Sequence, residues 1–173
     1  PVAIHGTNLI GKRVMDVGLG VLILIPLLPV MGLLALSIKL DSPGPIIFKQ
    51  KRVGMHHKEF VLYKFRSMRV GAEEEHARML VHNEMTGPLF KMRDDPRRTR
   101  VGRFLRKTSL DELPQLFNVF KGDMSLVGPR SERPQLIEKF QNEIPFYRAR
   151  LFVKPGLTGW AQVNFGYAWN IDT

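Results

Sequence analysis

The chain has 173 residues, of which 44% are hydrophobic and 24% are charged, and this balance excludes disordered and low-complexity proteins. The 26 Lys and Arg residues against 16 Asp and Glu residues give a formal net charge of +10. Such a charge indicates an anionic partner, which is nucleic acid, anionic lipid or a phosphorylated substrate. Because the chain has no cysteine, disulfide cross-links, thiol catalysis and cysteine-ligated metal sites are excluded.

A long apolar segment lies near the N-terminus. From Val17 to Ile38 the chain runs 22 residues without a charged side chain, enough for a helix to cross a bilayer core. Its length and the Leu-Asp-Ser-Pro sequence after it argue against a cleaved signal peptide. Pro26 and Pro29 interrupt the run, and each costs a helix interior about 3 kcal/mol. Basic residues flank both sides, so a spanning helix and a helix that re-enters on the same face stay open alternatives.

A β-hairpin is predicted after the Ser-Pro-Gly-Pro break at residues 42–45. Residues 46–53 and 59–66 have the composition of two strands, joined around Gly54. Because alternate side chains of a strand share a face, Phe60 and Leu62 are expected on the same face as Lys64.

Helices are predicted after the hairpin. Residues 72–81 and 135–142 have helical patterns, and the first of these segments carries three acids in its first turn. Basic residues alternate at helical spacing with Val101, Phe104 and Leu105, which predicts an amphipathic helix facing anionic lipid or phosphates. The basic residues of this cluster are Arg93, Arg97, Arg98, Arg100, Arg103, Arg106 and Lys107.

A capping box is predicted where Ser109 precedes Glu112 by three residues. The helix that it would open is expected to end at Lys121 and Gly122. Residues 122–130 are too short and too rich in Gly and Pro for a helix, and residues 154–159 are expected to form a loop.

The neighbourhood of Asp111 and Glu112 is the strongest candidate for chemistry. Arg106 and Lys107 precede the pair, and Arg130 follows in a Gly-Pro-Arg turn. A helix N-terminus with arginines attracts phosphate, and carboxylates are hard oxygen ligands for Mg²⁺. One carboxylate can then attack phosphorus while the other holds the metal, whereas the alternative is a pair of plain capping acids. The five histidines lack metal-ligand spacing, and neither a GxxxxGK[ST] loop nor a GxGxxG fingerprint is present.

Six motifs follow one another along the chain. They are Lys12-Arg13-x-x-Asp16, Ser42-x-Gly44-Pro45, Lys64-Phe65-Arg66-Ser67-Met68, the segment 108–116 (TSLDELPQL), the segment 121–130 (KGDMSLVGPR) and the segment 154–164 (KPGLTGWAQVN). In this order the motifs resemble those of the bacterial sugar transferases, or monotopic phosphoglycosyl transferases, over nearly the whole chain from Lys12 to Asn164.

For the fold, the resemblance and the local patterns imply an α+β, mostly helical protein. A re-entrant membrane helix, broken at Pro29 with Pro26 as a second breaker, would occupy residues 1–40 with its juxtamembrane segment. Residues 41–173 would form a cytoplasmic, membrane-associated catalytic domain with a small β-hairpin and amphipathic interfacial helices around a compact core. Relatives continue past Thr173, so the chain is expected to be cut short at its C-terminus. Longer members of the family have further membrane helices and a domain upstream, and whether such a domain precedes Pro1 is left open.

For the activity, the resemblance implies transfer of a sugar 1-phosphate, a hexose 1-phosphate above all, from a UDP-sugar to undecaprenyl (polyprenyl) phosphate with release of UMP. This would be the first membrane step of exopolysaccharide, capsule or O-antigen assembly, at the cytoplasmic face of the bacterial inner membrane. Asp111 would be the nucleophile that forms a phosphosugar ester, and Glu112 would bind the Mg²⁺ cofactor. The substrate-binding positions implied are Lys64, Arg66, Arg106, Arg130 and Gln162.

The partners expected are therefore a UDP-sugar, undecaprenyl phosphate and the lipid bilayer, with a homodimer as a candidate assembly and no nucleic acid. Two departures from the family pattern stand out. Leu28 replaces the Ser that many relatives carry before Pro29, and residues 165–170 differ from the commoner Gly-Arg-Asn pattern, so the sugar is left open. The alternatives are a non-enzymatic, membrane-anchored module that binds nucleic acid or anionic lipid, and an anchored scaffold. Acids interspersed among the bases, without a recognised nucleic-acid motif, argue against nucleic acid.

Overall fold

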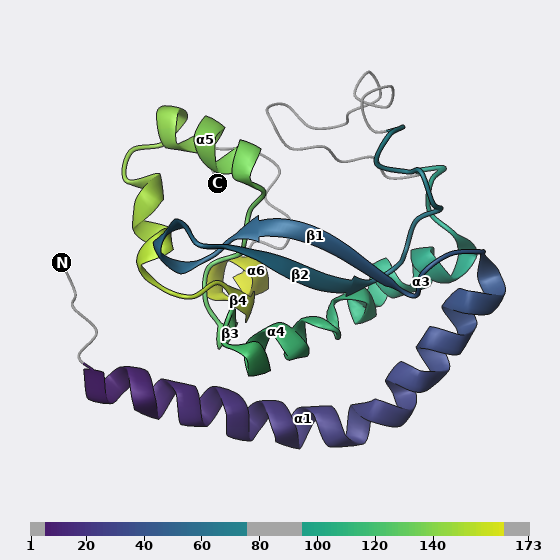
Figure 1. Cartoon of the computed structure of the whole chain (residues 1–173), viewed down its shortest axis with the longest axis horizontal. Coiled ribbons are helices and arrows are strands. Elements are labelled where there is room, and N and C mark those ends of the chain that lie inside the picture. The colour runs from purple at the N-terminus through teal and green to yellow at the C-terminus, as the bar shows by residue number, and fades with distance from the viewer. Residues whose placement is uncertain (1–5, 76–94, 165–173) are drawn as a thin grey trace.

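The computed structural model describes residues 6–75 and 95–164 and has an α+β, mostly helical fold, as predicted. A twisted β-hairpin crosses the middle of the molecule, and a long N-terminal helix runs along one side of it (Figure 1). In chain order the elements are α1 (Gly6–Asp41), β1 (Ile47–Val53), η1 (Met55–His57), β2 (Glu59–Phe65), α3 (Arg100–Thr108), η3 (Leu110–Glu112), α4 (Gln115–Lys121), β3 (Ser125–Val127), α5 (Pro134–Glu143), η4 (Tyr147–Phe152), β4 (Gly156–Thr158) and α6 (Trp160–Asn164).

Helix α1 is a single helix of 36 residues that contains both Pro26 and Pro29. It is long and apolar enough to cross a membrane, and side chains such as Leu22 and Leu33 on its outer side are exposed. Figure 1 shows that it bends in its C-terminal half and follows the contour of the rest of the molecule. Pro26 and Pro29 lie within this continuous helix and do not end it, and prolines are a common cause of such bends.

The N-terminal part of α1 is tied to the folded core by charged side chains. Asp16 is buried and accepts hydrogen bonds from Ser125 Oγ (3.1 Å) and from the backbone N–H of Leu126 (3.2 Å) in β3. Lys12 pairs with the same carboxylate, and Arg13 donates to backbone carbonyls at the end of α4. These contacts explain why a Lys-Arg-x-x-Asp motif precedes the apolar run.

The C-terminal end of α1 is held by the same body. The buried guanidinium of Arg66, just after β2, donates to three carbonyl oxygens, those of Ile38 (3.2 Å), Ser42 (2.6 Å) and Pro43 (2.9 Å). Asp41 in turn accepts a hydrogen bond from the N–H of Val101 in α3 (3.0 Å). The last carbonyls of a helix have no partner within the helix, so a cation there satisfies them.

The predicted hairpin is confirmed. Strands β1 and β2 pair antiparallel with Ile47 opposite Phe65 and Val53 opposite Glu59. Positive φ angles at His56 (55°) and His57 (61°) close the connection after Gly54. The predicted face packs on α4 and β3 in one core cluster, made of Phe60, Leu62, Leu116, Val119, Met124 and Leu126.

Asn118 fastens α4 to the free edge of β2. Its side chain is fully buried, its Nδ2 donates to the carbonyl of Val61 (2.7 Å), and its Oδ1 accepts from the N–H of Tyr63 (3.1 Å). Because η3 directly precedes α4, this attachment also sets Glu112 against Lys64 of β2.

The predicted capping box is wrong. Ser109 ends α3 in the left-handed conformation (φ 57°) and makes no side-chain cap hydrogen bond with any described residue, whereas an N-cap needs an extended backbone. Glu112 turns instead to Lys64. The following helix begins at Gln115, and it ends, as predicted, before Gly122 with its positive φ of 87°.

The loop predicted at residues 154–159 is corrected, because three of its residues form a strand. Strand β4 pairs in parallel with β3, which lies within residues 122–130, and Ser125 stands opposite Gly156. The two backbones approach so closely that a Cβ atom at Gly128 would lie 2.4 Å from the carbonyl oxygen of Lys154. Three-residue strands have no periodicity that a sequence pattern can reveal.

The helix predicted at 135–142 is confirmed as α5, and the basic amphipathic helix is confirmed as α3 with Leu105 buried and Phe104 exposed. Two arginines of the predicted basic cluster precede this helix, Arg98 and Arg97, and Arg97 is buried in an ion pair with Asp95. Of the helix predicted at 72–81, residues 72–75 form a hydrogen-bonded turn, and the rest lies outside the described residues. Arg93 and the segment 165–170 also lie outside them.

Candidate active site

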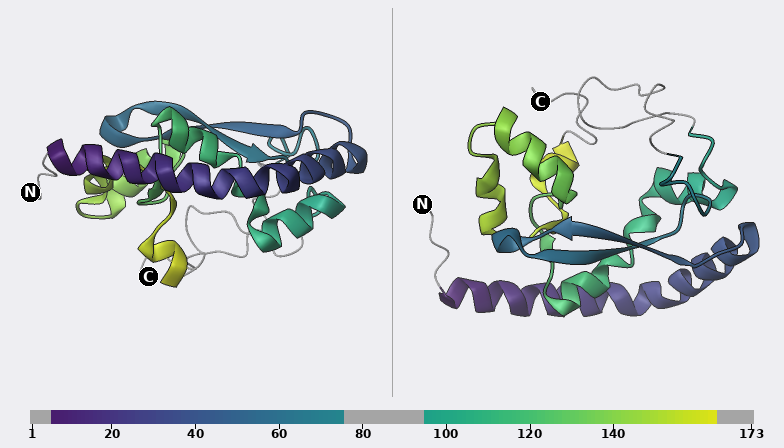
Figure 2. Two further views of the ribbon diagram at one scale, coloured as in Figure 1. Left: turned by 90° about the horizontal axis from the view of Figure 1, so that it is seen from below. Right: turned by 45° about the horizontal axis from the view of Figure 1, so that its top comes forward.

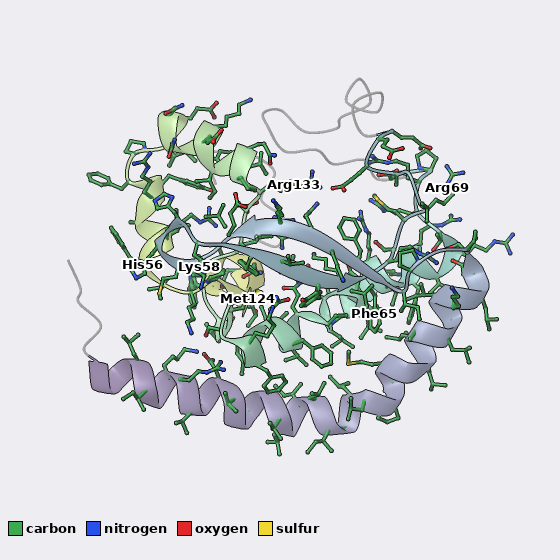
Figure 3. The ribbon with its side chains drawn as sticks, viewed as in Figure 1. His56, Lys58, Phe65, Arg69, Met124 and Arg133 are labelled. Carbon is green, nitrogen blue, oxygen red and sulfur yellow. The ribbon has the colours of Figure 1, made fainter. Side chains whose placement is uncertain are left out.

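A small polar pocket lies where the hairpin, the start of α4, the segment after β3 and α6 meet. It is lined by Arg52, Leu62, Lys64, Glu112, Gln115, Arg130, Ser131, Gly156 and Gln162. Four of the residues singled out from the sequence, Lys64, Glu112, Arg130 and Gln162, are thus brought together from distant parts of the chain. In Figure 3, Met124 lies on the α1 side of the hairpin and Arg133 on the opposite side.

Two of the lining residues, Lys64 and Glu112, form an ion pair. Lys64 Nζ lies 2.8 Å from Glu112 Oε1, and the two side chains are only 17% and 18% exposed. Burial by itself raises the pKa of Glu112, but the charges of Lys64 and Arg130 and the hydrogen bonds from Lys64 and Gln115 outweigh it. The pKa of Glu112 therefore lies below its usual value, and the side chain is an anion at neutral pH.

Asp111 lies beside this pair, on η3, and is 8% exposed. Burial raises the pKa of Asp111, the negative charge of Glu112 raises it further, and the charges of Lys64 and Arg106 oppose this shift without cancelling it. The environment thus pushes the pKa values of two adjacent carboxylates in opposite directions, a pattern typical of carboxylates with different roles in one site.

Arg106 approaches the site from the last turn of α3. Its Nε donates to Ser67 Oγ (2.9 Å), and its charge acts on Asp111. Arg66 lies elsewhere, at the C-terminal end of α1, where its guanidinium is engaged with backbone carbonyls. The structure therefore gives Arg66 a place in the attachment of α1 and does not bring it into the pocket.

Arg52 is a pocket residue that the sequence analysis missed. Its Nη1 donates to the carbonyl of Ser131 (2.8 Å), and its Nε and Nη2 donate to Gln50 Oε1 (3.0 and 2.7 Å). Burial lowers the pKa of Arg52 to about 10, so it stays a cation at neutral pH. The register of the hairpin places Arg52 and Gln50 on the face that carries Leu62 and Lys64, and strand alternation applied to both strands would have found it.

The carboxylates at this site are oxygen donors of the kind that a divalent cation accepts. Within residues 6–75 and 95–164, no group of three or more His, Asp or Glu side chains could hold a metal by itself. Glu112 supplies a carboxylate to the pocket lining, whereas Asp111, its neighbour in the chain, is not one of the lining residues. Mg²⁺ is usually bound through one or two carboxylates together with water and substrate phosphates, so this donor set suits Mg²⁺ bound to a diphosphate.

Several known proteins are similar in sequence to this chain over most of its length. It is 49% identical over 162 residues to the UDP-N-acetylgalactosamine-undecaprenyl-phosphate N-acetylgalactosaminephosphotransferase of Aeromonas hydrophila, covering 93% of this chain and 36% of that protein. It is 45% identical over 170 residues to the UDP-glucose:undecaprenyl-phosphate glucose-1-phosphate transferase of Escherichia coli (strain K12), covering 98% and 34%.

The undecaprenyl-phosphate galactose phosphotransferase of Salmonella typhimurium is 45% identical over 157 residues, covering 88% of this chain and 32% of that protein. The chain thus spans about a third of the length of these three relatives. A family model described as "Bacterial sugar transferase" matches residues 7–172, which is nearly every residue of the chain. Because this match takes in α1, the hairpin and the pocket together, the chain belongs to the bacterial sugar transferase family.

Proposed function

We propose that this protein transfers a sugar 1-phosphate from a UDP-sugar to undecaprenyl phosphate and releases UMP. The observation that carries the proposal is the convergence of Lys64, Arg130 and Glu112 in one pocket beside the buried Asp111. Cations of this kind bind phosphate oxygens, and Arg130 can grip two of them at once. The names of the relatives support the lipid acceptor and the sugar phosphate, and they include glucose, galactose and N-acetylgalactosamine.

In the first proposed step, a carboxylate oxygen of Asp111 attacks the phosphorus that carries the sugar. The bond from this phosphorus to the bridging oxygen breaks, UMP leaves with that oxygen, and a phosphosugar ester remains on Asp111. In the second step, a phosphate oxygen of undecaprenyl phosphate attacks the same phosphorus. Asp111 then leaves as a carboxylate, and the product is the sugar linked to undecaprenyl diphosphate.

The other side chains of the pocket bind and orient the substrates. Arg130 and Lys64 would hold the donor diphosphate, and Arg106 would keep Asp111 ionised by its nearby positive charge. Mg²⁺, held by Glu112 and the diphosphate, would neutralise charge on the departing UMP. Gln162 of α6 also lines the pocket and is a candidate contact for the sugar or uridine.

We further propose that residues 1–40 enter and leave the membrane on one face and that residues 41–173 form the catalytic domain on that face. In a spanning helix, the two ends lie about 30 Å apart on opposite sides of the hydrocarbon core. Here Asp16 and Asp41 are both bonded to the same folded body, to β3 and α3 respectively, which supports the re-entrant alternative. The donor is cytoplasmic, so this face would be the cytoplasmic face of the inner membrane.

Exposed apolar side chains support an interfacial position of the catalytic domain. Seen from below, α3 and α6 lie on the same side of α1, and the hairpin lies on the other (Figure 2). Phe104 of α3 is 54% exposed, and Trp160 of α6 is 78% exposed. Aromatic side chains of this kind are favoured at a membrane interface, next to basic residues such as Arg103.

The test is a panel of UDP-sugars mixed with the detergent-solubilised protein, with and without undecaprenyl phosphate. The donor alone should release up to one UMP per protein, and a mass increase of one sugar phosphate should appear on the peptide that contains Asp111. Undecaprenyl phosphate should then discharge this adduct and start turnover. Absence of UMP release with every sugar would overturn the proposed function, and release that strictly needs both substrates would favour direct transfer.

A further inference from the structure

The segment from Pro129 to Glu132 is held by hydrogen bonds at each of its four backbone carbonyls. Four consecutive carbonyl oxygens each accept a hydrogen bond from a different part of the chain. The pairs are Pro129 with Gly156 N (2.9 Å), Arg130 with Arg150 Nη2 (2.8 Å), Ser131 with Arg52 Nη1 (2.8 Å) and Glu132 with Val53 N (3.0 Å). A segment held in this way presents its side chains in fixed directions.

The direction of the Arg130 side chain depends on the two peptide groups that flank its Cα atom. The preceding group is fixed by β4 through Gly156, and the following group is fixed by the guanidinium of Arg150. Arg150 lies on η4, outside the pocket lining, and so its contact with the site runs through the backbone of Arg130.

Arg150 is itself oriented by an aromatic side chain. Its Nη1 donates to the hydroxyl oxygen of Tyr147, and its Cζ lies 4.6 Å from the centroid of that ring. Tyr147 packs against Phe140, with 5.2 Å between the ring centroids, and against a buried cluster that includes Val53 of β1. The planar guanidinium thus bonds the hydroxyl and the Arg130 carbonyl while it contacts the ring, which a lysine cannot do.

We propose that Arg150 is a positioning residue that holds the peptide after Arg130 and thereby aims the Arg130 guanidinium at the donor diphosphate. The inference rests on the proposed function, in which Arg130 binds that diphosphate. It assigns a role in substrate binding to η4, a segment that no motif of the sequence analysis included. Tyr147 contributes to the same positioning, because it orients the Arg150 guanidinium that bonds the Arg130 carbonyl.

The test is a double-mutant cycle on the full chain, with kcat and KM for the UDP-sugar as readouts. Arg150→Met should lower kcat/KM by about tenfold, the effect of losing one hydrogen bond from a charged donor. In the Arg130→Met background, the same change should have no further effect, because Arg150 acts through Arg130. If Arg150 had a purely structural role, Arg150→Met would instead lower kcat/KM by the same factor in the wild-type and the Arg130→Met backgrounds.

The matched control is Arg148→Met, which removes an exposed arginine of the same 3-10 helix that bonds Gln141. It should retain the wild-type kcat/KM. Arg150→Lys should recover less than half of the loss, and Tyr147→Phe, which keeps the ring but not the hydroxyl, should lower kcat/KM about threefold. These two variants preserve most of the packing, so they decide the question if Arg150→Met does not fold.

The outcomes separate the two proposals. If Arg130→Met lowers kcat/KM but the Arg150 variants keep a near-wild-type value, the positioning role of Arg150 is wrong and the proposed function still stands. Additive losses in the double variant would also overturn it, because Arg150 would then act independently of Arg130. Wild-type turnover in Arg130→Met would instead remove Arg130 from the phosphate site and contradict that part of the proposed function.

Discussion

Lys64 Nζ lies 2.8 Å from Glu112 Oε1 inside a pocket that we propose for a diphosphate and its Mg²⁺. Without substrate, the lysine therefore satisfies the carboxylate that the metal would use. In the proposed mechanism, a phosphate oxygen of the donor would compete with Glu112 for Lys64, and binding of the donor would free the carboxylate for the metal. This arrangement favours a metal that binds together with the donor over one that binds first.

Replacing Lys64 should make this order of binding visible. Lys64→Met removes the competing cation, so we expect the affinity for Mn²⁺, used as a probe without donor, to rise about tenfold. Turnover should fall, because the donor loses a phosphate ligand. Electron paramagnetic resonance of free Mn²⁺ measures the affinity directly. Lys58→Met, on the exposed turn of the hairpin (Figure 3), is the control and should leave Mn²⁺ binding unchanged. Equal Mn²⁺ affinities in the Lys64 variant and the wild type would contradict this order.

Asp111→Asn should abolish turnover and stabilise the fold. Because burial raises the pKa of Asp111, the stability that this group contributes is present at low pH and is lost as the pH rises through the folded-state pKa. At neutral pH the ionised side chain is therefore a cost to the native state, which a neutral amide removes. We expect a rise in the unfolding midpoint of about 2–4 °C, the effect of ~1 kcal/mol in a protein of this size.

The control for this thermal measurement is Glu138→Gln, which neutralises an exposed acid on α5. It should keep both activity and midpoint close to wild type. A lower midpoint in Asp111→Asn would mean that the ionised carboxylate is stabilised in the fold and that its pKa is not raised.

The raised pKa of Asp111 also predicts a pH dependence of the first step. In the proposed mechanism Asp111 attacks as a carboxylate, so the rate of UMP release should fall on acidification at a pH above the usual range of an aspartate. Glu112→Gln removes a negative charge that raises this pKa and frees Lys64 to act on Asp111. The acid limb should therefore move to lower pH, although the rate itself should drop. Single-turnover release of UMP measured across the acid range tests this shift. An acid limb that stays at the same pH or moves to higher pH in Glu112→Gln would contradict the prediction.

The attachment of α1 at both ends predicts its topology. Cysteines introduced before Lys12 and after Lys49 should both be protected from a membrane-impermeant reagent in whole cells and reactive in opened cells. Replacing Pro26 and Pro29 with Leu restores two backbone donors, so the segment should shift toward a spanning helix with one site exposed outside. Labelling of either introduced cysteine in whole cells, with Pro26 and Pro29 unchanged, would refute the re-entrant alternative.

The local features of the fold were predictable because they depend on neighbours in the chain. Alternating apolar residues mark β2, the glycine at 122 ends α4 with a positive φ, and helical spacing marks α5. The carboxylates at 111 and 112 and the lysine at 64 were likewise visible, as parts of motifs whose order identifies the family.

The tertiary structure alone decided which charged residues meet. Arg66 lies in a motif, yet its guanidinium donates to the carbonyls of Ser42 and Pro43 just after α1, and it does not line the pocket. Arg52 and Arg150 lie in no motif that stood out, but contacts across the fold bring their guanidinium groups to consecutive carbonyls of one segment. The left-handed turn at Ser109 directs Glu112 toward Lys64, where a capping box had been expected. A spacing rule describes neighbours along the chain, whereas a buried charge takes whatever partner the packing of distant segments leaves within hydrogen-bond distance.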